Sequence, residues 1–144
     1  DGNVKLKNDL MNFIEEHKLQ NNVIFTGSRH DINTFYALAD LVITASTDPE
    51  AFGRVAIEAQ AMGKFIIASN HGGSKETVID NETGYLFTPN DVEDLTKKLE
   101  NCIESEIYKQ PETIKSCINH IKENFTKIRM CDETIKFYKT VLDK

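Results

Sequence analysis

Four short runs of apolar residues restrict the possible fold more than any other feature of this sequence. They cover residues 23–26, 41–45, 65–68 and 85–87, and segments with helical spacing separate them. Strands that are apolar throughout and alternate with helices are typical of a parallel sheet covered on both faces. The sequence therefore predicts an α/β fold with a doubly wound, Rossmann-like parallel sheet.

The segments around these strands have the spacing of amphipathic helices. Residues 4–17 carry their apolar side chains on one stripe, and two more amphipathic segments follow the fourth strand. Asp31 is placed to cap a second helix, and Gly63 is placed to end a third in a left-handed conformation. Asn90 and Glu93 have the spacing of a capping pair for the helix after the last strand.

Composition and charge exclude several classes of function. The chain has 144 residues, which is enough for one domain with a sizeable core, so we expect a single domain over residues 1–144. A net charge of -6 with scattered lysines does not fit a nucleic-acid partner, which needs clustered cations. Three cysteines without CxxC spacing and four isolated histidines indicate neither disulfides nor a metal site.

The sequence has no long apolar run and no signal-peptide pattern at its first residues. We therefore expect no membrane span and a cytoplasmic location. For the full protein, peripheral association with the inner face of a membrane remains open.

The loop after the second predicted strand carries the candidate site. Ligands of parallel sheets bind beyond the carboxyl ends of the strands, and a helix start offers unpaired N–H groups that suit a phosphate. Gly53 would permit close approach, Glu50 precedes the helix, and Glu58 lies where its carboxylate can accept hydrogen bonds from ligand hydroxyls. These groups match a nucleotide sugar. Two glutamates eight residues apart are also commonplace as a loop charge and a solvated helix face.

Residues 50–63, Glu-Ala-Phe-Gly-Arg-Val-Ala-Ile-Glu-Ala-Gln-Ala-Met-Gly, resemble a known signature. It is the Glu-x7-Glu motif of family four of the retaining glycosyltransferases, which have the two-domain GT-B fold. Segments 22–27, 36–43, 71–78 and 83–87 resemble the same family in the same order. The resemblance implies that the chain is a partial C-terminal, donor-binding domain of a GT-B enzyme.

The resemblance also implies a role for each matching residue. Glu50 would face the transferred sugar as the catalytic residue, and Glu58 would bind the ribose hydroxyls. The other implied donor-binding residues are Ala51, Phe52, Gly53, Arg54, Val55, Gly27 and Ser28. For the Arg54 side chain, a contact with the diphosphate and an outward position remain equal alternatives. The donor is a substrate, and no metal or other cofactor is expected.

Compared with the family, the chain begins at Asp1-Gly2, which resembles the turn after a buried strand. Three features of the family are absent from this sequence. They are that buried strand, the Gly-Arg and Lys pair that clamps the diphosphate, and the N-terminal domain that binds a glycan or lipid acceptor. We therefore expect a fragment or a truncated product. A helix end stabilises an anion by about 0.3–2 kcal/mol, whereas enzymes lower barriers by about 8–23 kcal/mol. The isolated chain is thus expected to bind donor weakly and to transfer no sugar.

Two other functions remain open from the sequence. A sugar-nucleotide 2-epimerase would use the same fold and donor, and a non-catalytic α/β module would bind only a nucleotide or a protein.

Overall fold

The computed structural model describes residues 4–142, so the turn expected at Asp1-Gly2 lies outside the described residues. The chain divides into two compact units, the first ending at Ile32 and the second beginning at Asn33. Each unit is described by itself.

The first unit contains helix α1 (Val4–Glu16), which confirms the helix expected over residues 4–17. No residue of α1 is buried. Residues 23–26 form no strand, contrary to the expectation, and the Ile24 side chain is 84% exposed. An apolar run becomes a strand only when a neighbouring strand pairs with its N–H and C=O groups. Within residues 4–142 the paired strands begin at Val42, and none of them pairs with this segment.

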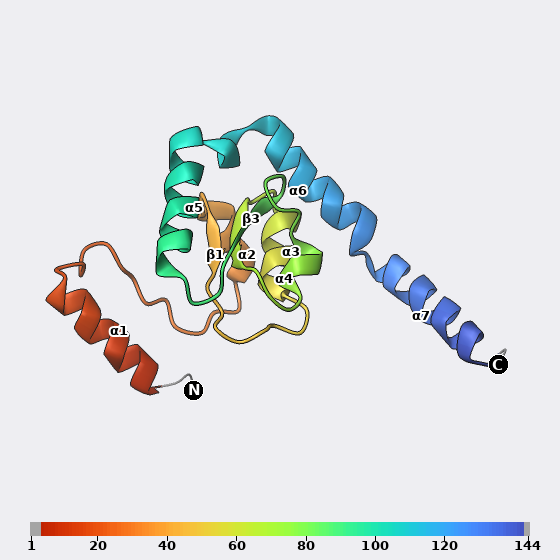
Figure 1. Cartoon of the computed structure of the whole chain (residues 1–144), viewed down its shortest axis with the longest axis horizontal. Coiled ribbons are helices and arrows are strands. Elements are labelled where there is room, and N and C mark those ends of the chain that lie inside the picture. Colours follow the sequence, from red (N-terminus) through yellow and green to blue (C-terminus); the bar gives the residue numbers. More distant parts are fainter. Residues whose placement is uncertain (1–3, 143–144) are drawn as a thin grey trace. The chain divides into compact units, whose positions relative to one another are not determined.

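The second unit is built on a parallel sheet of three strands in the order β1-β2-β3 (Figure 1). These strands are β1 (Val42–Thr44), β2 (Ile66–Ser69) and β3 (Gly84–Phe87). Ile66 lies opposite Val42 on one side and Gly84 on the other. A Cβ at Gly84 would come within 2.8 Å of the Ile66 side chain, so glycine allows these two strands to pair. The three later predicted strands are confirmed.

The central strand β2 is buried on both faces. On one face Ile66 and Ala68 pack with Ala56 of helix α3 (Arg54–Ala61). On the other face Ile67 packs with Cys102 of helix α5 (Val92–Ser105). Burial of each isoleucine contributes about 1.5–3 kcal/mol to the stability of the fold. Helices on both faces confirm the doubly wound α/β fold.

Helix α5 begins differently from the expectation. Its N-cap is Asp91, whose carboxylate accepts a hydrogen bond from the Asp94 N–H at 2.9 Å. Asn90 instead has φ of 63°, a turn conformation, so the capping pair predicted for Asn90 and Glu93 is wrong. The cap requires extended backbone, and Asp91 has it.

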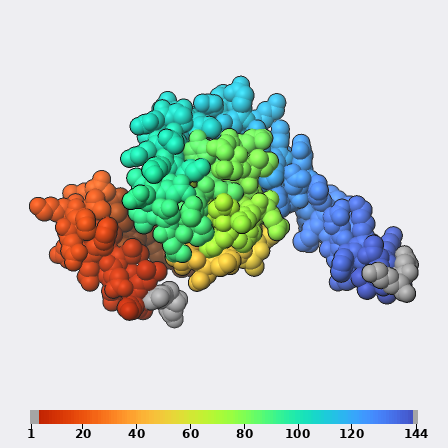
Figure 2. All heavy atoms as spheres, in the orientation of Figure 1, coloured from red at the N-terminus to blue at the C-terminus, as the bar shows by residue number. Residues whose placement is uncertain are grey.

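The remaining elements are α2 (Ile32–Leu38), α4 (Ser74–Thr77), the 3-10 turn η1 (Ile107–Lys109), α6 (Pro111–Asn124) and α7 (Lys127–Leu142). Helix α6 packs on α3 at Gly63, which has φ of 72° as expected, and a Cβ there would lie 2.9 Å from Ile114. Helix α7 has no buried residue, and Figure 2 shows its atoms, in blue, projecting beyond the rest of the second unit.

Cys102 and Cys117 are buried free thiols, whereas the free Cys131 is exposed. Among residues 4–142, no helix combines the length and the apolar character needed to cross a membrane.

Candidate functional site

The loop between β1 and α3 carries Glu50, and side chains of two loops hold it. The Ser46 hydroxyl donates a hydrogen bond to Glu50 Oε1 at 2.5 Å. His71 lies in the turn that follows β2, and its ring nitrogen Nε2 is 2.9 Å from the Ser46 carbonyl oxygen. His71 therefore occupies a turn position, and the Ser46 hydroxyl holds the Glu50 carboxylate beyond the carboxyl end of β1.

The backbone of this loop lies directly against the glycine turn after β2. The Gly73 N–H donates to the Glu50 carbonyl oxygen at 2.7 Å. A Cβ at Gly73 would lie 2.6 Å from both Cα and the carbonyl oxygen of Phe52. Gly72 has φ of 55°, and a Cβ there would lie 2.8 Å from the Glu50 backbone nitrogen. Both positions therefore require glycine, and the two loops form one surface.

Helix α3 begins after Gly53, which has φ of 74° and ψ of 51°. The Gly53 carbonyl oxygen accepts the hydrogen bond from the Ala56 N–H at 3.0 Å. Within the described chain, the five backbone N–H groups of residues 51–55 donate no hydrogen bond to a protein acceptor. Such a run of amides at the positive end of a helix is a typical binding surface for phosphate or sugar oxygens.

Glu58 lies on the same helix, and protein donors bind both of its oxygens. The Tyr36 hydroxyl donates to Oε2 at 3.1 Å, and the Arg54 guanidinium donates to Oε1 at 3.1 Å. Burial, and secondarily the hydrogen bond to Glu58, raise the pKa of Tyr36 to about 12. The phenol is therefore a neutral hydrogen-bond donor throughout the physiological pH range.

The loop and helix bring together most of the predicted site. Residues 50–58 form one continuous segment with Glu50 and Glu58 at its ends. Gly27 and Ser28 belong to the first unit, so their part in the site stays a prediction. Arg29 forms an ion pair with Asp31 at 2.7 Å, and this interaction lowers the pKa of the Asp31 carboxyl.

The sequence did not identify Tyr36 and Ser46 as site residues. Tyr36 lies on α2 among apolar residues, and its side chain is buried, with only 5% exposed. Its hydroxyl contacts Glu58 from 22 positions away in the chain. Ser46 lies four residues before Glu50, and this spacing in the loop was the signal available for it.

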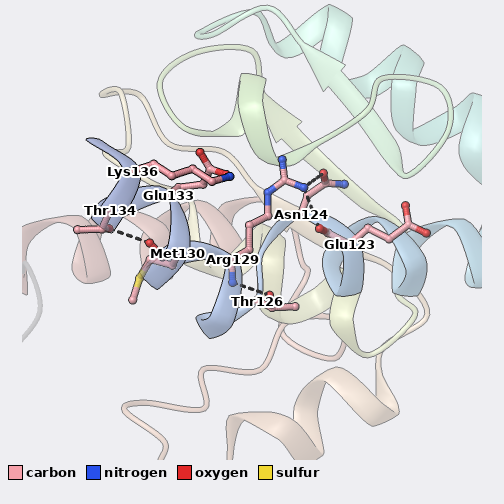
Figure 3. A network of polar contacts seen from close by, with 8 residues as sticks. All are labelled: Glu123, Asn124, Thr126, Arg129, Met130, Glu133, Thr134 and Lys136. Atoms are coloured by element: carbon pink, nitrogen blue, oxygen red, sulfur yellow. Dashed lines mark hydrogen bonds and ion pairs between the residues drawn. The ribbon is translucent and has the colours of Figure 1, made fainter. Parts of the chain in front are cut away.

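The Phe52 side chain lies beside the junction between α6 and α7. Its ring packs edge-on against Phe125, with centroids 6.1 Å apart, beside a cavity of about 530 Å³. Figure 3 shows how this junction is fixed: Arg129 donates to the Glu123 carbonyl oxygen at 3.0 Å and to the Asn124 side chain at 3.2 Å. The junction thus holds the Phe52 end of the loop.

An open parallel sheet with a helix start and two carboxylates beyond its carboxyl edge is the arrangement of a nucleotide-binding α/β domain. Over residues 2–123 the chain matches the family described as glycosyl transferases group 1, and it belongs to that family.

Several relatives and solved structures are similar to this chain. Protein CapJ of Staphylococcus aureus is 30% identical over 137 residues, which are 92% of this chain and 34% of that protein. A glycosyltransferase from Rickettsia africae is 35% identical with a TM-score of 0.86, covering 96% of this chain and 37% of that one.

HepE of Anabaena in complex with UDP-glucose is 29% identical with a TM-score of 0.86, covering 96% of this chain and 38% of that one. The chain therefore spans little more than a third of the length of these proteins. The family match favours a transferase and gives no support to a 2-epimerase or a non-catalytic module.

Proposed function

We propose that this chain is the donor-binding part of a retaining glycosyltransferase of family four, with Glu50 and Glu58 as its Glu-x7-Glu pair. The observation that carries the proposal is the segment 50–58, where two held glutamates flank five unpaired backbone N–H groups. The Anabaena relative, whose structure contains UDP-glucose, supports a nucleotide sugar as the ligand.

Each group in the segment has a proposed role. The carboxylate of Glu58 accepts hydrogen bonds from the ribose hydroxyls, and the amides of residues 51–55 bind phosphate and sugar oxygens. Glu50 orients the transferred sugar and eases the positive charge that develops on it in an oxocarbenium-like transition state. Ser46 holds the Glu50 carboxylate in place for this role. Gly27 and Ser28 contact the base.

The charge balance of the site limits what these residues do alone. The leaving diphosphate is stabilised by positive groups, and here they are the start of α3 and Arg54, whose guanidinium is paired with Glu58. A helix end contributes about 0.3–2 kcal/mol, against a typical requirement of about 8–23 kcal/mol. The 144 residues are therefore proposed to bind donor weakly and to transfer no sugar.

In the whole protein, a second domain would bind a glycan or lipid acceptor, and transfer would retain the anomeric configuration. The proposal places that protein in the cytoplasm, at the inner face of the membrane when the acceptor is a lipid. It includes no metal and no resident cofactor, so a chelator should leave donor binding unchanged.

The test measures donor binding by titrating isotope-labelled protein with UDP-glucose and following the NMR shifts of the 51–55 amides. Glu58→Gln should weaken binding about tenfold or more, because it removes a charged acceptor. Glu50→Gln should change donor binding little. In the whole protein, assayed for sugar transfer, the same substitution should lower turnover. Glu104→Gln, an exposed glutamate on α5, is the matched control. Equal binding by the parent, Glu58→Gln and Glu50→Gln, with equal turnover, would refute the site.

A further inference from the structure

The carboxylate of Glu58 has one permanent partner and one exposed partner. Tyr36, which donates to Oε2, is 5% exposed and belongs to the packed interior. Arg54, which donates to Oε1, has a side chain that is 82% exposed. Oε1 is therefore the oxygen whose protein partner is exposed to solvent.

This geometry conflicts with the proposed role of Glu58 unless Arg54 moves. Ribose hydroxyls reach Glu58 from solvent, because the interior side is filled by Tyr36. The oxygen turned away from Tyr36 is Oε1, and it is paired with the Arg54 guanidinium. An exposed ion pair between residues four apart on a helix is weak, so it opens easily.

We propose that Arg54 exchanges partners when donor binds, leaving Glu58 and binding the diphosphate. The inference rests on the proposed donor site. Arg54 is the first residue of α3, so its side chain starts beside the amides that would hold the phosphates. A guanidinium binds phosphate oxygens with two parallel hydrogen bonds, whereas it makes a single hydrogen bond to Glu58 Oε1. The side chain that pairs with Glu58 would thus recognise the diphosphate instead.

The exchange makes Arg54 a specificity-determining residue. A nucleoside diphosphate compensates Arg54 for the loss of Glu58, because it supplies another anion. A nucleoside also displaces Arg54 from Glu58, but it supplies no anion to replace the carboxylate. The site should therefore prefer the diphosphate by more than the helix amides alone would provide, and Arg54 should oppose nucleoside binding.

The test compares UDP with uridine, ADP with adenosine and GDP with guanosine, by NMR titration of the parent chain and of Arg54→Ala. The pair whose diphosphate binds most tightly to the parent is then followed. Arg54→Ala should weaken diphosphate binding about tenfold and strengthen nucleoside binding about two- to threefold. The exposure of the Arg54 side chain means that the fold should tolerate the change. Lys97→Ala, at an exposed position of α5, controls for net charge.

A second readout is ionic strength, because added salt screens an exposed contact with phosphate. Diphosphate binding should fall more steeply with salt in the parent than in Arg54→Ala. Changes of both ligands in the same direction, or no change in either, would overturn the exchange while leaving the donor site intact. Failure of all three nucleoside diphosphates to bind the parent would overturn the donor site itself, and this role of Arg54 with it.

Discussion

Gly73→Ala changes the contact between the two loops by one methyl group. The Gly73 backbone has φ of -62° and ψ of -20°, which alanine adopts without strain. The cost therefore comes from the added Cβ, which would lie 2.6 Å from Cα and the carbonyl oxygen of Phe52. The Phe52 carbonyl carbon would lie closer still to this Cβ. Because Cβ atoms essentially never come closer than 3.0 Å to another heavy atom, the backbone of the loop must move by more than 0.4 Å.

The expected magnitudes follow from this displacement. Overpacking costs about 1–3 kcal/mol, and alanine lowers the entropy of the unfolded chain by the equivalent of about 0.4–1 kcal/mol. The free energy of unfolding should fall by about 1–2 kcal/mol, or about 3–8 °C in Tm. Because the moved backbone includes the amides proposed to bind donor, UDP binding should weaken about tenfold, which corresponds to the loss of about one hydrogen bond to a charged group.

Thermal unfolding followed by circular dichroism measures the first effect, and NMR titration with UDP measures the second. Gly63→Ala is the control, since its Cβ would meet the Ile114 side chain on α6 and its φ of 72° adds strain. This control should lose stability and keep the affinity for UDP. Parent-like UDP binding by Gly73→Ala at a lowered Tm would refute the claim that the glycine turn sets the loop.

The remaining predictions concern the core and a helix cap. Burial raises the pKa of the Cys102 and Cys117 thiols from 9.0 to about 11, so the stability that they contribute is complete below pH 9.0 and is lost as pH rises towards 11. Denaturant titrations between pH 9 and pH 11 should show the free energy of unfolding falling as pH rises. Below pH 9, a thiol reagent should modify only Cys131 in the folded chain. Asp91→Ala should lower the free energy of unfolding by about 1 kcal/mol through loss of the α5 cap. Asn90→Gly keeps the φ of 63° without strain and should not lower it; an equal loss in both variants would contradict the assignment of the cap.

Local pattern predicted the sheet well where the strands pair with one another. Residues 41–45, 65–68 and 85–87 were predicted as strands, and strands lie at 42–44, 66–69 and 84–87. Residues 23–26 are equally apolar yet form no strand, because pairing depends on a partner elsewhere in the chain. Apolar pattern alone does not contain that information.

For the candidate site, too, features close together in the sequence were predicted and contacts between distant segments were not. From their order along the chain, Glu50, Gly53 and Glu58 were predicted to lie on one loop and the helix after it, and they do so in the structure. The hydrogen bond of Tyr36 to Glu58 could not be predicted, because it depends on how α2 packs beside α3. A tyrosine within an apolar stripe gives no sign of where its hydroxyl points.

The hydrogen bonds between the loop after β1 and the turn after β2 also constrain how this protein can change during evolution. The bonds of His71 to Ser46 and of Gly73 to Glu50 join two segments about 25 residues apart. An insertion or deletion in either segment breaks the match with the other, so the two are expected to be inherited as a pair. A chimera that takes one segment from a relative should lose function, and a chimera that takes both should keep it.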